Sequence, residues 1–271
     1  MNSLYENNYL SAEKISAKNK SCEIGKNIII LPETDSTNTY AAKLAAEGAA
    51  HGTVILAESQ TNGKGRLGRR FESPAGTGLY MSVIIRPQFD ISCAPLITSA
   101  AAVAAAEAAE KLCGEKIRIK WVNDLYINGR KICGILTEAL MNPQMKNLSH
   151  AVIGIGINVG KCVFPEELRD IATSIEDETG KIINRNTLCG KILSRLEYYL
   201  DNIEHHEHLD EYRRRELLTG NHITANIGNE KIEGLAVGID DNANLILKLP
   251  DGSEKKLTSG EANLCRIRRE K

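Results

Sequence analysis

Residues 63–70 read Gly-Lys-Gly-Arg-Leu-Gly-Arg-Arg, and Ser59-Gln60-Thr61-Asn62 lead directly into them. Glycines are interleaved with Lys and Arg, so this stretch, the glycine loop, combines a freely turning backbone with local positive charge. Glycine tolerates conformations that turn several N–H groups toward one point. Arginine can also grip an oxyanion with two parallel bonds. The stretch therefore predicts a loop that holds a phosphate or a carboxylate, and a solvated basic turn is the simpler alternative.

The same stretch fits the pattern Gly-x-Gly-x-x-Gly, which raises the alternative of a dinucleotide-binding fold. That motif follows a strand and opens a helix whose N-terminus receives the pyrophosphate. Residues 53–57 do read as a strand, but residues 71–78 contain a proline and two glycines and cannot continue as a helix. No acidic residue of a second strand follows at the usual offset. The glycine loop therefore argues against a nicotinamide-cofactor site.

The length and charge of the chain limit the remaining classes. With 271 residues it can form one large domain and one small domain. Its formal net charge is −1, so it offers no general attraction to nucleic acid. Seven cysteines without a Cys-x-x-Cys pair indicate reduced thiols. Because we find no signal peptide and no long apolar run, we expect a cytoplasmic protein that does not enter a membrane.

Apolar runs and turn signals predict a mixture of strands and helices up to about residue 219. A hairpin is expected across Asn128-Gly129, the strongest two-residue turn signal. His205, His206 and His208 lie in a polar helical stretch, where a solvated face is favoured over a metal site. The mostly antiparallel strands with interspersed helices indicate an α+β domain. Strands are expected at residues 27–31, 54–58, 79–85, 117–122, 125–127, 131–138 and 151–159, and helices at 39–47, 94–113 and 187–218.

The pattern changes near residue 220. Short strands separated by turns such as Asp251-Gly252 follow one another closely, which predicts a small β-barrel of roughly fifty residues. We therefore divide the chain into a polar N-terminal tail (1–26), a main domain (27–219) and a C-terminal barrel (220–271). The barrel strands are expected at residues 223–226, 231–238, 245–249, 255–258 and 264–267.

Four separated segments of the main domain place polar or small residues at the ends of apolar strands. Strand ends at one edge of a sheet commonly converge on a ligand site. Lys120 is flanked by Trp121 and by Asn123-Asp124, so we expect a cation held against a ligand rather than an ordinary surface lysine. The four segments are residues 36–38, 60–70, 120–124 and 154–159.

In this order and spacing the segments resemble the biotin protein ligases, over residues 28–268. Lys64 stands where that family usually has Arg, and Val122 where it usually has Pro. Lys64 keeps a cation, and Val122 changes turn rigidity rather than chemistry, so neither departure argues against the resemblance. The motifs are Asp-Ser-Thr-Asn (35–38), Gln-Thr with the glycine loop (60–69), Lys-Trp-x-Asn-Asp (120–124), Gly-Ile-Leu-x-Glu (134–138) and Gly-x-Gly-Ile-Asn (154–158).

The resemblance implies a class II synthetase-like α+β fold with a mixed, mostly antiparallel sheet and an SH3-like C-terminal barrel. It implies an enzyme that uses ATP and Mg²⁺ to convert biotin to biotinyl-5′-adenylate, releases pyrophosphate, and transfers biotin to a lysine of a carboxylase carrier domain. Many relatives begin with a DNA-binding domain. Because the first motif starts at Asp35, we expect the short form, which does not bind DNA. Relatives often dimerise through the sheet, which leaves a homodimer open.

The resemblance also implies roles for individual residues. Arg66 and Lys120 are expected to supply catalytic charge, Arg66 at the phosphate and Lys120 between the biotin carboxylate and the α-phosphate. The residues expected to bind biotin are Ser36, Thr37, Asn38, Gln60, Gly63, Lys64, Lys120 and Gly134. Those expected to bind ATP are Arg66, Arg69, Trp121, Asn123 and Asn158, with Asp124 as a candidate metal ligand.

Two other activities stay open on the same fold. A lipoate or octanoate ligase would also use a lysine near the acyl carboxylate, but the complete glycine loop and the C-terminal barrel favour biotin. A non-catalytic biotin sensor would not need Arg66 and Lys120. Pyrophosphate release measured with biotin and with lipoate would separate the three activities.

Overall fold

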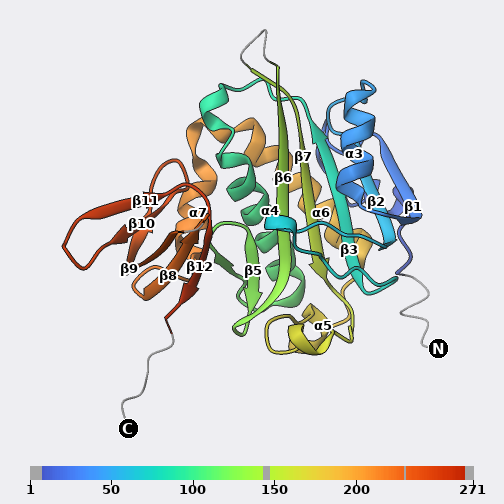
Figure 1. The fold of residues 1–271 in the computed structure, drawn as a ribbon. Helices are drawn as coiled ribbons and strands as arrows, with labels where there is room; N and C mark the ends of the chain where they lie inside the picture. Colours follow the sequence, from blue (N-terminus) through green and yellow to red (C-terminus); the bar gives the residue numbers. More distant parts are fainter. Residues whose placement is uncertain (1–7, 143–146, 229, 266–271) are drawn as a thin grey trace.

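The larger part of the molecule is a seven-stranded sheet in the order β1-β2-β3-β7-β6-β5-β4 (Figure 1). The computed structural model describes residues 8–142, 147–228 and 230–265. β1 (Ile28–Thr34) and β2 (Val54–Gln60) pair in parallel, and the other neighbouring pairs are antiparallel. The mixed, mostly antiparallel sheet that we expected is therefore confirmed.

The remaining strands of this sheet follow the predicted order along the chain. β5 and β6 are joined across Asn128-Gly129, whose φ angles of 49° and 82° are those of a tight hairpin turn. The hairpin prediction is confirmed. The strands are β3 (Gly78–Ile85), β4 (Arg118–Lys120), β5 (Asp124–Ile127), β6 (Arg130–Asn142) and β7 (Asn147–Asn158).

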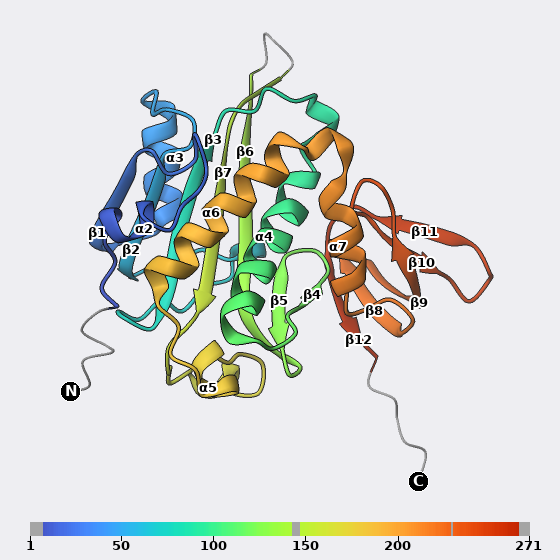
Figure 2. The same ribbon diagram turned by 180° about the vertical axis from the view of Figure 1, so that it is seen from behind.

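Helices cover both faces of the sheet. α3 (Thr37–Ala46) lies on one face, where Ala41 and Ala45 are buried against alternate residues of the central strands. α4 (Leu96–Cys113) and α6 (Arg185–Asp201) lie on the other face and pack against each other (Figure 2). The alanine-rich α4 is buried along most of its length, since small side chains let neighbouring elements approach closely. α5 (Ile175–Thr179) and α7 (Glu207–Arg215) complete this part.

Residues 8–26, part of the segment that we expected to be a short polar tail or helix, pack against α6. They include α2 (Ala12–Ser16), and Ile15 and Ile24 are buried. Arg185 at the start of α6 binds a backbone carbonyl of this segment, and Glu197 accepts three N–H bonds from it. These contacts span more than 170 residues, so no local pattern reveals them. Residues 1–7 of the expected tail lie outside the described residues.

His208 of α7 is buried, whereas we expected a solvated face. Its Nε2 lies 2.9 Å from Ser99 Oγ of α4, and burial lowers the pKa of His208 to about 4. His205 is exposed. In the described part of the chain, no group of three or more His, Cys, Asp and Glu side chains is arranged to hold a metal ion.

The C-terminal part is a separate five-stranded antiparallel sheet in the order β11-β10-β9-β8-β12. It corresponds to the small barrel that we expected; within the described residues β11 and β12 are the two edges of the sheet, and no closed barrel is seen there. The last strand begins at Glu261 rather than at residue 264, and residues 266–271 lie outside the described part. The strands are β8 (His222–Ile227), β9 (Glu230–Ile239), β10 (Leu245–Lys248), β11 (Glu254–Leu257) and β12 (Glu261–Leu264).

None of the helices in the described ranges combines the length and apolar character that crossing a bilayer requires.

Candidate functional site

A cavity of about 480 Å³ opens at the ends of the central strands. Its wall combines the N-terminus of α3, the glycine loop, strands β5 to β7 and residues 260–262 of the C-terminal sheet. Its volume is in the range of small-molecule sites. Gly63 lies in an adjoining surface depression. The other predicted site residues all line the cavity: Ser36, Thr37, Asn38, Gln60, Lys64, Arg66, Arg69, Lys120, Trp121, Asn123, Asp124, Gly134 and Asn158.

One end of the cavity consists of neutral hydrogen-bonding groups, and we call Ser36, Thr37 and Gln60 the neutral end. Gln60 Oε1 accepts hydrogen bonds from Thr37 N (2.8 Å) and Thr37 Oγ1 (3.2 Å). Gln60 Nε2 donates to Ser73 Oγ at 2.8 Å, which sets the orientation of the amide. Ser36 is the N-cap residue of α3, but its side chain makes no capping bond. Its hydroxyl is therefore available to a ligand.

Asn38 lies beside the neutral end, and its amide is engaged by protein groups. Its Nδ2 donates to Glu138 Oε2 (2.8 Å) and Leu136 O (3.2 Å), and its Oδ1 accepts from Ser82 Oγ (2.6 Å). Gly154 leaves room for this amide, since a Cβ there would lie 2.1 Å from Asn38 Oδ1. Asn38 therefore has little hydrogen-bonding capacity left for a ligand, and its contacts support the neighbouring residues of the neutral end instead.

The glycine loop folds back on itself as a small hairpin. Gly65 N donates to Arg69 O at 2.8 Å, and Phe71 N donates to Gly63 O at 2.8 Å. A Cβ at Gly63 would lie 2.5 Å from Phe71 O, so close backbone packing requires glycine here. Leu67 has a φ of 56° and an exposed side chain.

Another part of the cavity wall carries cations, and we call Arg66, Arg69, Lys120 and Lys131 the charged end. Arg66 Nη1 donates to Asn123 Oδ1 at 3.1 Å. The buried Asn123 in turn donates to the backbone of β6 at 2.6 Å. Asn123 therefore orients a cation, a contact that the sequence did not suggest.

Two contacts join the charged end to the C-terminal sheet. Arg69 pairs through both Nη atoms with Glu261, and its Nη1 lies 2.9 Å from Oε1. Lys120 Nζ donates to Asn263 Oδ1 at 2.7 Å. Burial lowers the pKa of Lys120, although the nearby Asp124 opposes this shift. The C-terminal sheet is thus part of the wall of the cavity, which the sequence did not predict because these partners lie more than 140 residues apart.

Lys131 lines the cavity although the sequence did not single it out. Its Nζ lies 2.7 Å from Asp124 Oδ1 and close to Gly134, where a Cβ would be 3.4 Å from this nitrogen. Residues three apart on a regular strand face opposite sides. The register of β6 against β5 shifts by one residue between Lys131 and Cys133, and this bulge brings Lys131 to the same face as Gly134. No local sequence pattern signals the bulge.

Glycines give the middle of the cavity an open, apolar wall. A Cβ on Gly156 would lie 2.8 Å from the Phe71 ring, and one on Gly134 would lie 3.6 Å from it. Phe71 packs edge-to-face on Tyr80, with 6.4 Å between ring centroids. Phe71 is a second lining residue that the sequence did not single out.

Trp121, Asp124 and Asn158 reach the cavity, and each also has a protein partner. Trp121 Nε1 donates to the backbone carbonyl of Ala243 in the C-terminal part at 3.0 Å. Asn158 Nδ2 donates to the carbonyl of Thr173 at 3.0 Å. Asp124 is paired with Lys131, so a divalent cation here would need oxygen atoms of a ligand in addition to this carboxylate.

Comparisons with known proteins agree on one family. A model described as the biotin/lipoate A/B protein ligase family matches residues 30–158, and one described as the biotin protein ligase C terminal domain matches residues 219–264. The bifunctional ligase/repressor BirA of Bacillus spizizenii is 36% identical over 260 residues, which cover 94% of this chain and 79% of that protein.

Two further matches are similar in length to this chain. The biotin–[acetyl-CoA-carboxylase] ligase of Paracoccus denitrificans is 32% identical, covering 83% of this chain and 95% of that protein. The structure of the biotin protein ligase from Aquifex aeolicus in complex with biotin and ATP is 31% identical, with a TM-score of 0.74. That match covers 89% of this chain and 99% of the other.

Proposed function

Because this chain belongs to the biotin/lipoate A/B protein ligase family, and within it to the biotin protein ligases, we propose that biotin binds at the neutral end and ATP at the charged end. The protein is an ATP-dependent biotin–protein ligase. It activates biotin to biotinyl-5′-adenylate, releases pyrophosphate, and transfers biotin to a carboxylase carrier domain. The observation that carries the division is that one cavity is lined both by neutral groups that bond to one another and by cations whose protein partners lie on other elements.

The neutral end matches the ureido ring of biotin. The Thr37 hydroxyl donates to Gln60, and Ser82 Oγ lies 2.8 Å from its oxygen, so one lone pair of this oxygen is left to accept a hydrogen bond from a ligand N–H. Gln60 Nε2 carries a second proton besides the one donated to Ser73, and this proton can reach a ligand carbonyl. The dithiolane ring of lipoate has neither group and would leave the remaining lone pair of Thr37 and the second proton of Gln60 without a partner. This argument favours biotin over lipoate or octanoate.

The middle of the cavity suits the aliphatic chain of biotin. The chain would run along Gly134, where the missing Cβ leaves room, against the ring of Phe71. Its carboxylate would then lie near Lys131 Nζ. The resemblance assigned this position to Lys120, which also lines the cavity. We propose that Lys131 shares the role, with Lys120 nearer to the C-terminal sheet.

The first half-reaction brings two anions together. A carboxylate oxygen of biotin attacks the α-phosphorus, and the bond between this phosphorus and the pyrophosphate oxygen breaks. Lys131, Lys120 and Arg66 offset the repulsion, and Arg66 is already held in place by Asn123. Arg69 would assist the departing pyrophosphate after exchanging Glu261 for phosphate oxygens.

Other groups complete the nucleotide site in this proposal. The amide of Asn158 can pair with adenine, and Trp121 contributes wall. Lys64 and Gly63 would offer backbone donors to biotin. Mg²⁺ would be held by Asp124 together with the phosphates, where it would neutralise phosphate charge. In the second half-reaction, the amine of a carrier lysine attacks the carbonyl carbon of the adenylate, and AMP leaves.

We also propose a cytoplasmic enzyme with no affinity for duplex DNA or membranes. All seven cysteines are free, which supports a reducing compartment, and the net charge of −1 offers nothing to a polyanion. A homodimer through the main sheet stays open. We retain 27–219 and 220–271 as functional units and add residues 8–26 to the first.

The assignment is tested by pyrophosphate release from the purified chain with ATP and either biotin or lipoate, with and without Mg²⁺. We expect release that requires both biotin and Mg²⁺, followed by labelling of one lysine on a carrier domain. Equal activity with lipoate, or none with biotin, would overturn it.

A further inference from the structure

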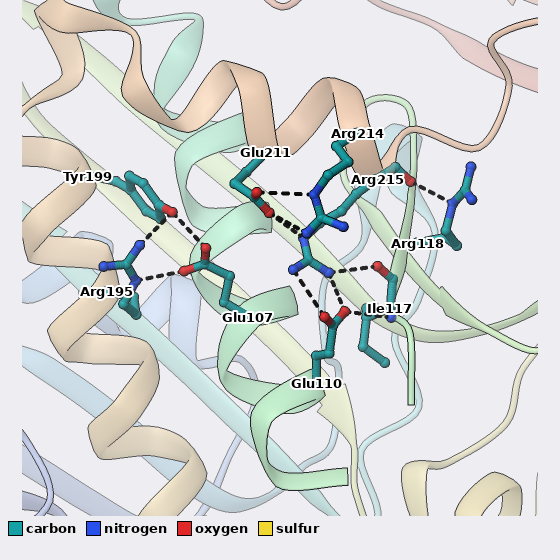
Figure 3. Close-up of polar contacts among 9 residues, drawn as sticks. All are labelled: Glu107, Glu110, Ile117, Arg118, Arg195, Tyr199, Glu211, Arg214 and Arg215. Carbon is teal, nitrogen blue, oxygen red and sulfur yellow. Dashed lines mark hydrogen bonds and ion pairs between the residues drawn. The ribbon is translucent and has the colours of Figure 1, made fainter. Parts of the chain in front are cut away.

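Two clusters of charged side chains lie on α4, and none of their members lines the cavity (Figure 3). In the first, Glu107 pairs with Arg195 of α6, with 2.6 Å between Oε2 and Nε. In the second, Glu110 pairs with Arg215 at the end of α7. The two clusters use the same residue types on the same helix, but they lead to different parts of the molecule.

Arg215 is buried, and its guanidinium joins three elements. It pairs with Glu110 of α4, and its Nε lies 3.3 Å from Glu211 Oε2 within α7. Its Nη1 also donates to the carbonyl of Ile117, just before β4, at 3.1 Å. A buried cation with several partners holds them in one arrangement, because losing any partner exposes an uncompensated charge.

The chain that follows Arg215 is bound along β4. Arg118 donates from Nε to Arg215 O (3.0 Å) and from Nη2 to Glu216 O (2.7 Å). Leu217 N donates to Ile119 O at 2.8 Å. The residues that lead into the C-terminal sheet are therefore bound along the short strand that ends at Lys120, and Figure 3 shows the contact of Arg118 with the backbone of Arg215.

The far end of β4 is held by the C-terminal part itself. Lys120 Nζ binds Asn263, and the indole N–H of the next residue, Trp121, donates to Ala243 O. β4 and Trp121 are thus clamped between the segment after Arg215 and the C-terminal sheet. The same sheet supplies Glu261 to the charged end.

We propose that Arg215 is a positioning residue that docks the C-terminal sheet on β4 and so keeps the wall of the charged end in place. Its effect on kinetics rests on the proposed function. Its effect on docking rests on the contacts alone. The neutral end is built from the start of α3 and the end of β2, which Arg215 does not touch, so binding of ATP should suffer while binding of biotin does not.

The docking of the C-terminal sheet on β4 can be followed by NMR through the indole N–H of Trp121, the single tryptophan of the chain. Arg215→Lys keeps the charge but loses the planar fork that reaches several partners at once. In Arg215→Lys we expect the ¹⁵N-indole resonance of Trp121 to shift. We also expect its indole proton to exchange with water about tenfold faster than in the wild type, because the hydrogen bond to Ala243 O then opens more often. Arg195→Lys is the matched control, and it should leave the resonance and its exchange rate unchanged.

The kinetic arm uses the same two variants in pyrophosphate release. Arg215→Lys should raise KM for ATP about tenfold and leave KM for biotin unchanged, since small displacements of positioning groups have large effects. Arg195→Lys should change neither. Glu110→Gln and Glu107→Gln form a second matched pair. Glu110→Gln keeps an acceptor for the N–H of Ile117 and replaces Arg215→Lys if that variant does not fold.

The outcomes separate the two proposals. Wild-type protein that releases no pyrophosphate with biotin contradicts the proposed function, and the indole signal still decides the docking. An active wild type with an unchanged indole and unchanged KM for ATP in both Arg215→Lys and Glu110→Gln overturns the positioning role. If Arg195→Lys and Glu107→Gln have the same effects as Arg215→Lys and Glu110→Gln, the substitutions loosen α4 in general. This result would also overturn the positioning role of Arg215.

Discussion

The neutral and charged ends of the cavity are built by different means. At the neutral end, the buried Thr37 and the partly buried Gln60 bond to each other. At the charged end, each cation has a partner from another element, as Arg66 has Asn123 and Arg69 has Glu261. Neutral groups are buried at low cost once they are hydrogen-bonded, whereas a cation needs a partner of its own. The neutral end is therefore preformed, whereas a ligand at the charged end would have to compete with protein partners such as Glu261.

Removing charge should have the largest effect. Arg66→Ala, Lys120→Ala and Lys131→Ala should each slow biotin-dependent pyrophosphate release about 10²–10³-fold, which is about 2.7–4 kcal/mol, because each stabilises charge that develops in the reaction. Thermal unfolding should change little, since these side chains are partly exposed.

The two lysine variants show which lysine contacts the biotin carboxylate. If Lys120→Ala releases pyrophosphate at a normal rate and Lys131→Ala is strongly slowed, then Lys131 alone binds the biotin carboxylate. Normal rates in all three variants would show that the charged end is not where the chemistry takes place.

At the neutral end the effect should be smaller and of another kind. Thr37→Val keeps the shape but removes the hydroxyl, so KM for biotin should rise about tenfold while kcat stays near its normal value. Steady-state kinetics measure both constants. Thr98→Val, whose hydroxyl bonds Thr137 outside the cavity, is the control. A fall in kcat instead would mean that the neutral end takes part in the reaction itself.

Partner exchange at the charged end should alter protection of the glycine loop. Its glycines add backbone entropy and its cations repel one another, so an anion should favour the closed loop. Trypsin should cut after Lys64, Arg66, Arg69 or Arg70 in the free protein, and biotin with MgATP should slow this cleavage at least roughly fivefold. Equal cleavage with and without ligands would mean that the loop is as preformed as the neutral end.

The smallest effect is expected at Lys64. Its Nζ lies 3.7 Å from Glu138 Oε1, and both side chains are partly exposed. Lys64→Arg restores the residue usual in the family and should change kcat/KM less than about twofold, as for an exposed ion pair. A larger change in kcat/KM for biotin or for ATP would show that the Lys64 side chain contacts that substrate.

Motifs predicted much of the fold and of the neutral end, because turn chemistry and strand ends are local. Asn128-Gly129 is an example. Contacts made by pairing and burial were missed. Lys131 reaches the cavity through a bulge, Glu261 arrives from another domain, and residues 8–26 pack on α6 through partners distant in sequence. The polar surroundings of His208 gave no sign of its burial against α4.

The bulge in β6 also bears on how this chain can change by mutation. Ile132 is the additional residue between Lys131 and Cys133 that sets the phase of the strand. Its deletion would leave every lining residue in the sequence, yet it would turn Lys131 to the far side of the sheet and leave Asp124 without its ion pair. Deletion of this single codon could therefore inactivate the site, although many substitutions at the same position would not. In a relative, an alignment gap at Ile132 would indicate a different arrangement of charged side chains in the cavity.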